Sequence, residues 1–211
     1  MQYLNTTATG AVKAGAGTLY GVIVNSNTSG TFQFNDGAGG TSAGVKATGV
    51  LTSSGVFQDT ETVTVEGKTY TFVDALSGAA NEVLIGANAA ASLDNFKSAV
   101  NGTAGEGSTY GTGTVAHDLV TATTNTATAQ TIEAKRVGTY ANAYATTETC
   151  DNVAWGAAVM ESGAESSILM INTFTPTTGV SSVHMFGEGI SFSKGLYYTE
   201  GGTADVTIIY S

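Results

Sequence analysis

Short apolar runs separated by clusters of Gly, Asn and Ser recur along the whole chain. The run at residues 19–24 predicts a strand buried on both faces, and residues 31–34 alternate as a strand with one buried face does. Residues 62–65 and 69–73 flank Glu66-Gly67-Lys68, a spacing that predicts a tight hairpin. Further strands are expected at 119–123, 131–137, 168–174, 183–186, 190–192, 196–199 and 204–210. The pattern therefore predicts a mainly β fold.

One segment has helical spacing instead. Leu93, Phe96 and Val100 are three and four residues apart, so they share one face of a helix near residues 92–101. Ser92 is a suitable N-cap, and Gly102 is placed to end the helix. We expect this short helix to pack its apolar face against a sheet.

The composition narrows the classes of partner. Charged residues are only 11% of the 211-residue chain, under half the usual share. The formal net charge is −10, with seven Lys and Arg residues against 17 acidic ones. A nucleic-acid-binding surface needs a basic stripe, so neither nucleic acid nor an anionic membrane is expected as a partner. The first residues, MQYLNTTATG, have neither the basic nor the apolar region of a signal peptide, so we expect no Sec export.

The charge is concentrated in the middle of the chain. Residues 47–163 hold 12 acidic and 4 basic side chains, whereas residues 1–46 and 164–211 together hold 5 acidic and 3 basic ones. Such asymmetry is typical of an acidic module carried by a less charged base. The first twelve residues, with Tyr3, Leu4 and Val12 among small polar neighbours, predict either an arm that orders against another subunit or a frayed terminus.

The candidates for metal or nucleophilic chemistry are few. His117, beside Asp118, and His184 lack the spacing of a paired metal site, and we expect both to be structural, with His184 pointing to solvent or to a neighbouring subunit. Asp36 and Glu106 lie in glycine-rich loops without a calcium-binding motif. The lone Cys150 is close in sequence to two acidic residues, which raise a thiol pKa and favour a passive thiol. The sequence predicts no cofactor, no bound metal and no catalytic site.

A carbohydrate-acting enzyme is the alternative from another functional class. Such an enzyme needs two opposed carboxylates in a groove lined by aromatic rings. Two carboxylate pairs and five aromatic residues are available for this role: Asp59 with Glu61, Glu148 with Asp151, and Tyr70, Tyr110, Tyr140, Tyr144 and Trp155. We expect most of these aromatic side chains to pack in the core.

Residues 47–163 resemble a module that recurs in bacteriophage virion proteins. The resemblance is carried by ETVTVEGKTYTFVDAL, NEVLIGANAAASLDNFKSAVNG and IEAKRVGTYANAYATTET. The flanks, AGAGTLYGVIVNSNTSGTFQFNDG and ISFSKGLYYTEGGTADVTIIYS, resemble the two ends of a small phage β-sandwich protein. The resemblance implies a discontinuous β-sandwich or jelly-roll-like base, residues 1–46 and 164–211, with a β-rich module inserted at 47–163.

The function implied by this resemblance is a structural one in the virion. The expectation is a head decoration, or cement, protein that binds the outer surface of the assembled capsid and projects an acidic knob. Its partners would be the major capsid protein and copies of itself, in a homotrimer or another closed ring, with Tyr3, Leu4 and Val12 as contact residues. The alternative is a tail or fibre component whose tyrosine-bearing loops contact the host surface.

Overall fold

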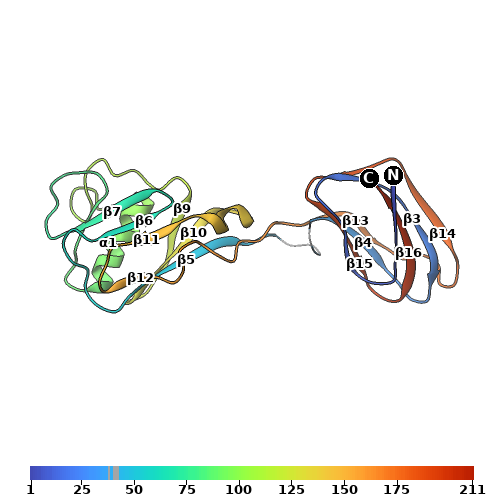
Figure 1. The fold of residues 1–211 in the computed structure, drawn as a ribbon, viewed down its shortest axis with the longest axis horizontal. Coiled ribbons are helices and arrows are strands. Elements are labelled where there is room, and N and C mark those ends of the chain that lie inside the picture. The colour runs from blue at the N-terminus through green and yellow to red at the C-terminus, as the bar shows by residue number, and fades with distance from the viewer. Residues whose placement is uncertain (38, 40–42) are drawn as a thin grey trace. The chain divides into compact units, whose positions relative to one another are not determined.

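The computed structural model describes residues 1–37, 39 and 43–211, which form a mainly β protein with 51% strand and 9% helix. The chain divides into two compact units. The jelly-roll unit comprises Met1–Gly44 and Glu165–Ser211, and the inserted unit comprises Val45–Ala164. The sequence placed these boundaries two residues later at the first junction and one residue earlier at the second. Figure 1 shows the strands of each unit.

The jelly-roll unit is a sandwich of two four-stranded antiparallel sheets (Figure 1). One sheet has the order β1-β16-β3-β14 and the other has the order β13-β4-β15-β2. Its strands are β1 (Gln2–Thr6), β2 (Gly10–Ala14), β3 (Gly17–Asn27), β4 (Phe32–Asp36), β13 (Ile168–Phe174), β14 (Ser182–Phe192), β15 (Gly195–Glu200) and β16 (Ala204–Tyr210). Successive strands alternate between the two sheets except at the β4–β13 hairpin, and this connectivity is that of an eight-stranded jelly roll.

The core of this unit follows from the alternation along its strands. On β3, Val22 and Val24 face inward, and on the neighbouring strand β16 their partners Ile208 and Val206 do the same. The Tyr198 ring packs between Phe32 and Phe34 of the second sheet, with centroid distances of 5.8 and 5.5 Å. The first long strand, β3, therefore pairs with β16, the last strand of the chain, although the whole inserted unit separates the two in sequence.

The insertion lies in a hairpin of the jelly roll. Strands β4 and β13 pair with one another, and Asp36 is the partner of Ile168 at the end where the chain leaves the sheet. Within the inserted unit, Val45 and Ala164 exchange backbone hydrogen bonds of 2.8 and 2.9 Å, so its two ends also lie together. An insertion whose ends are adjacent adds little closure entropy to the host unit.

The inserted unit contains two more four-stranded sheets, of order β12-β5-β10-β9 and β11-β6-β7-β8. All of its strand pairs are antiparallel except β7 with β8. Its elements are β5 (Lys46–Ser53), β6 (Thr62–Val65), β7 (Lys68–Val73), β8 (Glu82–Leu84), α1 (Ala89–Asn101), β9 (Val120–Asn125), β10 (Ala129–Val137), the 3-10 helix η1 (Thr139–Ala143), β11 (Thr146–Glu148) and β12 (Val153–Trp155). Both sheets and α1 contribute side chains to one hydrophobic core.

Helix α1 begins earlier than the sequence predicted. Leu93, Phe96 and Val100 are buried and Gly102 ends the helix in a left-handed conformation, which confirms the predicted face and terminus. The N-cap, however, is Asn88, whose side chain accepts a 2.9 Å hydrogen bond from the backbone N–H of Ala91. The Ser92 hydroxyl instead lies inside the first turns, where it accepts from Gly86 N–H and donates to the Asn88 carbonyl. The prediction of Ser92 as the cap was wrong because Ala89–Ala91 extend the helix by a turn.

Three further expectations can be compared with the structure. The hairpin is confirmed: Val65 pairs with Lys68, and Glu66 and Gly67 form the turn with φ of 40° and 76°. The strands expected at 183–186 and 190–192 are one strand, β14, with a register shift between Met185 and Ile190. The N-terminal residues are not an unpaired arm, because they form β1 and β2 at the edges of the two sheets.

Among the described residues no helix is long and apolar enough to span a membrane.

Candidate functional site

Asp36 is a structural anchor of the jelly roll. Its carboxylate accepts hydrogen bonds from the backbone N–H groups of Ser193, Lys194 and Gly195, at 2.8, 2.6 and 3.2 Å, and from the Ser193 hydroxyl at 2.8 Å. Burial raises the pKa of this carboxyl, but the hydrogen bonds together outweigh burial and hold the pKa below its ordinary value. Asp36 thereby fixes the turn between β14 and β15.

Glu106 has a comparable role in the inserted unit. Its carboxylate accepts a hydrogen bond of 2.6 Å from the backbone N–H of Gly113, across the loop that follows α1. Among residues 1–37, 39 and 43–211, no group of three or more His, Cys, Asp or Glu side chains is placed to hold a metal ion. Both acidic residues considered for calcium therefore stabilise loops.

His117 lies at a groove of about 690 Å³ between the β6–β7 hairpin and the loop 115–119. The imidazole is buried, and both of its nitrogens contact backbone: Nε2 lies 3.0 Å from the Val65 carbonyl oxygen, and Nδ1 accepts from Leu119 N–H at 3.2 Å. Burial is the main cause of a lowered His117 pKa, and the cations Lys68 and Lys135 add to it. The ring is therefore a neutral structural group, oriented by backbone and not by Asp118.

His184 is half-buried on the edge strand β14. Its partner across the ladder is Val22, a core residue, so the register turns His184 toward the inner side of the sheet and not outward as the sequence suggested. The Ser182 hydroxyl lies 3.0 Å from His184 Nε2.

Among the carboxylates considered for glycoside chemistry, Glu61 is held by backbone hydrogen bonds. Glu61 is buried, and its two carboxylate oxygens accept from the backbone N–H groups of Gln58 and Asp151, each at 2.8 Å.

Burial, with the charges of Glu61 and Glu148, raises the pKa of the Cys150 thiol to about 12. The direction agrees with the expectation of a passive thiol, but the main cause is burial.

The five aromatic residues do not form one platform. Tyr70 and Tyr110 are buried in the core, and Tyr70 meets Phe96 edge to face at 5.3 Å. Trp155 lines a separate groove of about 310 Å³ beside Glu148, and its ring N–H donates to the Thr147 carbonyl at 3.1 Å. The aromatic rings therefore serve different parts of the unit.

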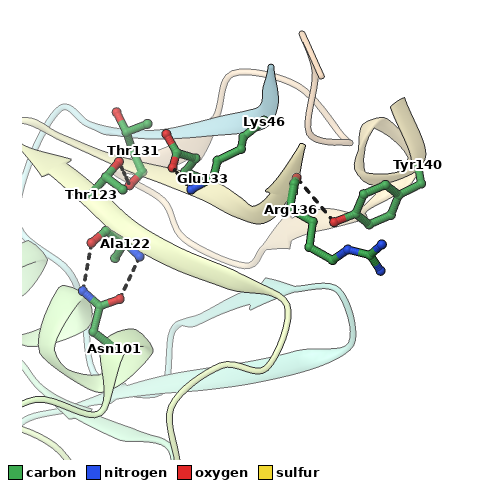
Figure 2. A network of polar contacts seen from close by, with 8 residues as sticks. All are labelled: Lys46, Asn101, Ala122, Thr123, Thr131, Glu133, Arg136 and Tyr140. Atoms are coloured by element: carbon green, nitrogen blue, oxygen red, sulfur yellow. Dashed lines mark hydrogen bonds and ion pairs between the residues drawn. The ribbon is translucent and has the colours of Figure 1, made fainter. Parts of the chain in front are cut away.

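Tyr140 and Tyr144 form an aromatic pair near η1. Their rings meet edge to face at 5.7 Å, and Tyr140 is 41% exposed. The Arg136 guanidinium lies 5.5 Å from the Tyr140 ring centroid, and the Tyr140 hydroxyl donates to the Arg136 carbonyl at 3.4 Å (Figure 2). An exposed tyrosine stacked with arginine has the composition of a protein-binding hot spot.

The three residues expected to contact other subunits lie in edge strands. Tyr3 is 64% exposed on β1, whereas Leu4 is half-buried and pairs with Ile208, a core residue. Val12 on β2 is partly buried and packs against the jelly-roll core. Only Tyr3 therefore presents a largely exposed apolar side chain.

Sequence reasoning missed the surface to which Tyr3 belongs. The register aligns Tyr3, Ile209, Gly21 and Met185 in one row across the sheet β1-β16-β3-β14. A second row contains Asn5, Thr207, Ile23 and Val183. We call these two rows the outer sheet face, because the residues that alternate with them on β3 and β16 point into the core.

The largely exposed apolar side chains of the outer sheet face lie on its two edge strands, with Tyr3 on β1. Val183 and Met185 on β14 are 63% and 57% exposed. Met185 lies over Gly21, where an added Cβ would come within 2.6 Å of the methionine sulfur. An added Cβ would also come within 2.7 Å of the His184 carbonyl oxygen, so only glycine fits at position 21. The alternation of apolar residues along each strand was visible in the sequence. The sequence does not show which strands are neighbours in the sheet, so it could not group these residues into one surface.

No family model, no curated protein and no solved structure matches this chain.

Proposed function

We propose that this protein is a bacteriophage head decoration protein that binds the outer surface of the assembled capsid. The observation that carries the proposal is a jelly roll in which β3 of the first segment pairs with β16 of the last segment. A complete second unit is inserted in its β4–β13 hairpin. Jelly rolls occur in viral capsid domains and also in lectins and cupins, so the fold by itself supports several functions. The resemblance of both flanks and of the insert to phage virion proteins favours the first of these.

The physical role fits the construction of the chain. A protein that binds the assembled head and not its separated subunits stabilises the head by mass action, and many identical sites give avidity. The jelly-roll unit supplies edge strands and an apolar face for contacts with capsid protein and with other copies. The inserted unit carries 12 acidic and 5 basic side chains, a charge that disfavours contact with nucleic acid.

A tail or fibre component is the second candidate. The specific observation in its favour is the exposed pair of Arg136 and Tyr140 (Figure 2), with the half-buried Tyr144 beside it, whose residue types recur at recognition surfaces. In that case the inserted unit would contact the host surface, and the jelly-roll unit would attach it to the particle.

Copy number on purified particles tests the proposal. Particles released by cells that encode this chain are purified, and the ratio of this chain to the major capsid protein is measured by quantitative mass spectrometry. A copy number comparable to that of the capsid protein is expected for decoration, and a few copies per particle would support the tail assignment. Absence from the particle would refute both.

Antibody labelling against the inserted unit gives an independent result. Electron microscopy of labelled particles should show label over the whole head for a decoration protein and at the tail for a fibre component.

Adding the purified chain to heads that lack it should raise the temperature at which the heads release DNA, and a chain with no effect on head stability would contradict a cement role.

A further inference from the structure

We propose that the inserted unit binds a neutral oligosaccharide in two adjacent grooves that share Glu148. The first groove, of about 310 Å³, is lined by Glu148 and Trp155 with small neighbours on either side. The second, of about 300 Å³, is lined by Glu148 together with the polar residues Ser54, Asp151 and Asn152. Each volume is at the lower end of the range of small-molecule pockets, so a short chain of sugar rings fits the pair.

The two grooves lie where the edge strands β11 and β12 approach one another. Glu148 on β11 pairs with Val63, and Trp155 on β12 pairs with Leu51. Both partners are core residues, so the register turns Glu148 and Trp155 to the inner sides of their sheets. At an edge no further strand covers an inward side chain, and both residues therefore remain partly exposed in the first groove.

Trp155 provides the surface on which a sugar ring packs. Its indole packs against the core and lies over Gly49, where an added Cβ would be 3.5 Å from the ring. The indole N–H donates to the Thr147 carbonyl at 3.1 Å, which fixes the orientation of the ring. The next three residues are Gly156, Ala157 and Ala158, whose small side chains leave room beside it. A rigid, oriented aromatic ring of this kind packs against the apolar C–H face of a pyranose.

Glu148 provides the hydrogen-bond acceptor. Its carboxylate forms no ion pair and accepts no hydrogen bond from any residue in 1–37, 39 and 43–211. In contrast, Glu61 and Glu66 each accept from backbone N–H groups. Partly buried carboxylates are normally satisfied within the fold, so the open acceptor at Glu148 points to a ligand that donates. Sugar hydroxyls donate to an ionised carboxylate in short, strong hydrogen bonds.

The charge of the grooves favours a neutral ligand. Among the described residues that line them, two are acidic, Glu148 and Asp151, and none is Lys or Arg. Anionic sugars and phosphates are therefore repelled. A quaternary ammonium ion is recognised by a cage of aromatic rings, and of the described lining residues Trp155 alone is aromatic. A neutral oligosaccharide presents both apolar ring faces and hydroxyl donors, which matches one ring beside one open carboxylate.

The small size of the grooves predicts weak binding by a single chain. We expect a Kd on the order of 1 mM, because a ligand that buries little surface gains little beyond the cost of its own ordering. Many copies on one particle would raise the overall affinity by avidity. This last consequence rests on the proposed place in a particle, whereas the binding itself does not.

Titration of the purified full chain with neutral oligosaccharides tests the site. The probes are trisaccharides and hexasaccharides of glucose, galactose, mannose and N-acetylglucosamine, each added up to about 50 mM. Trp155 is the only tryptophan of the chain, so its fluorescence reports occupation of the first groove. A saturable change with at least one probe is expected. No saturable change with any probe, or saturation by tetramethylammonium at a lower concentration than by any sugar, would overturn the proposal.

Matched variants locate the binding. Glu148→Gln should raise the Kd about tenfold or more because the charged acceptor is lost, whereas Glu188→Gln, at an exposed position of the jelly-roll unit, should leave it unchanged. Ala158→Leu, which fills the groove beside the ring and leaves Glu148 in place, should abolish binding. Ala80→Leu, exposed elsewhere on the inserted unit, should not. Unchanged binding by Glu148→Gln or by Ala158→Leu would overturn the proposed site.

The result of these titrations is separate from that of the capsid experiments. A chain that decorates heads and binds no sugar would overturn the oligosaccharide site alone. A chain that binds sugars through Glu148 and is absent from particles would refute the capsid proposal alone.

Discussion

Replacing Asp36 with asparagine preserves the size of the side chain but removes its charge and one of its acceptor oxygens. In the folded protein both oxygens are used, one by Ser193 N–H and hydroxyl and the other by the N–H groups of Lys194 and Gly195. The asparagine NH₂ group must face one pair of donors. At least one backbone N–H then loses its acceptor in a site where Asp36 is only 8% exposed.

The expected cost is about 2 to 4 kcal/mol of the free energy of unfolding of the jelly-roll unit. Hydrogen bonds to a charged acceptor contribute about 1.5 to 3 kcal/mol each, and the remaining bonds weaken when the acceptor becomes neutral. A domain of this size is stable by about 5 to 15 kcal/mol, so the loss is a large fraction of the total. Glu188→Gln, at an exposed position of the same unit, is the matched control and should change stability by less than about 0.5 kcal/mol.

The difference should also depend on pH. Because the folded pKa of Asp36 is below its ordinary value of 3.8, its contribution is complete above that value and is lost as pH falls toward the folded pKa. The gap between the unchanged chain and Asp36→Asn should therefore narrow on acidification. Hydrogen exchange in urea, followed by mass spectrometry on peptides from β15 and β16, measures the stability of this unit separately. Equal stabilities of Asp36→Asn and Glu188→Gln, or a gap that does not narrow in acid, would refute this reasoning.

Three further predictions concern the inserted unit and can be followed by its tryptophan fluorescence during urea unfolding. The folded pKa of His117 lies below its ordinary value of 6.5, so the inserted unit should lose stability as pH falls through 6.5 and below. His117→Gln should flatten this dependence, and an unchanged slope of unfolding free energy against pH would contradict the prediction. Asn101 donates to and accepts from one residue of β9, at 2.8 and 2.9 Å (Figure 2), so Asn101→Asp, which cannot donate, should cost about 2 kcal/mol, and a neutral effect would count against it. Gly67→Ala, at φ 76° with open space around the added Cβ, should lower the free energy of unfolding by about 1 kcal/mol. Gly156→Ala, outside the left-handed region, should lower it by less, and equal losses would show that the turn relaxes.

Local pattern was sufficient for the strands with strong alternation. The run at residues 204–210 coincides with β16, and the Glu66-Gly67 turn was readable because glycine tolerates the positive φ that a two-residue hairpin needs. Short or glycine-containing strands such as β5, β8, β11 and β12 were not predicted, because each is stabilised by its neighbours in the sheet and not by its own composition.

The candidate sites depend on contacts that local sequence does not contain. Asp36 meets its donors 157 to 159 residues later in the chain, so its structural role could not be distinguished from a calcium site. Tyr3 was expected to contact another subunit, and its side chain is 64% exposed. Its grouping with Val183 and Met185 required the strand order, which places the first and the sixth strands of the jelly roll at opposite edges of one sheet.

Excising the inserted unit tests the central structural claim most directly. In this variant residues 45–164 are replaced by a short Gly-Ser linker that joins Gly44 to Glu165, since β4 and β13 already pair as a hairpin. The measurement is hydrogen exchange of the β3 and β16 amides through a urea titration. A single cooperative transition, with both strands protected to the same free energy, is predicted. Exchange of both strands at the rates of an unfolded chain in the absence of urea would contradict the claim that the two separated segments form one jelly roll.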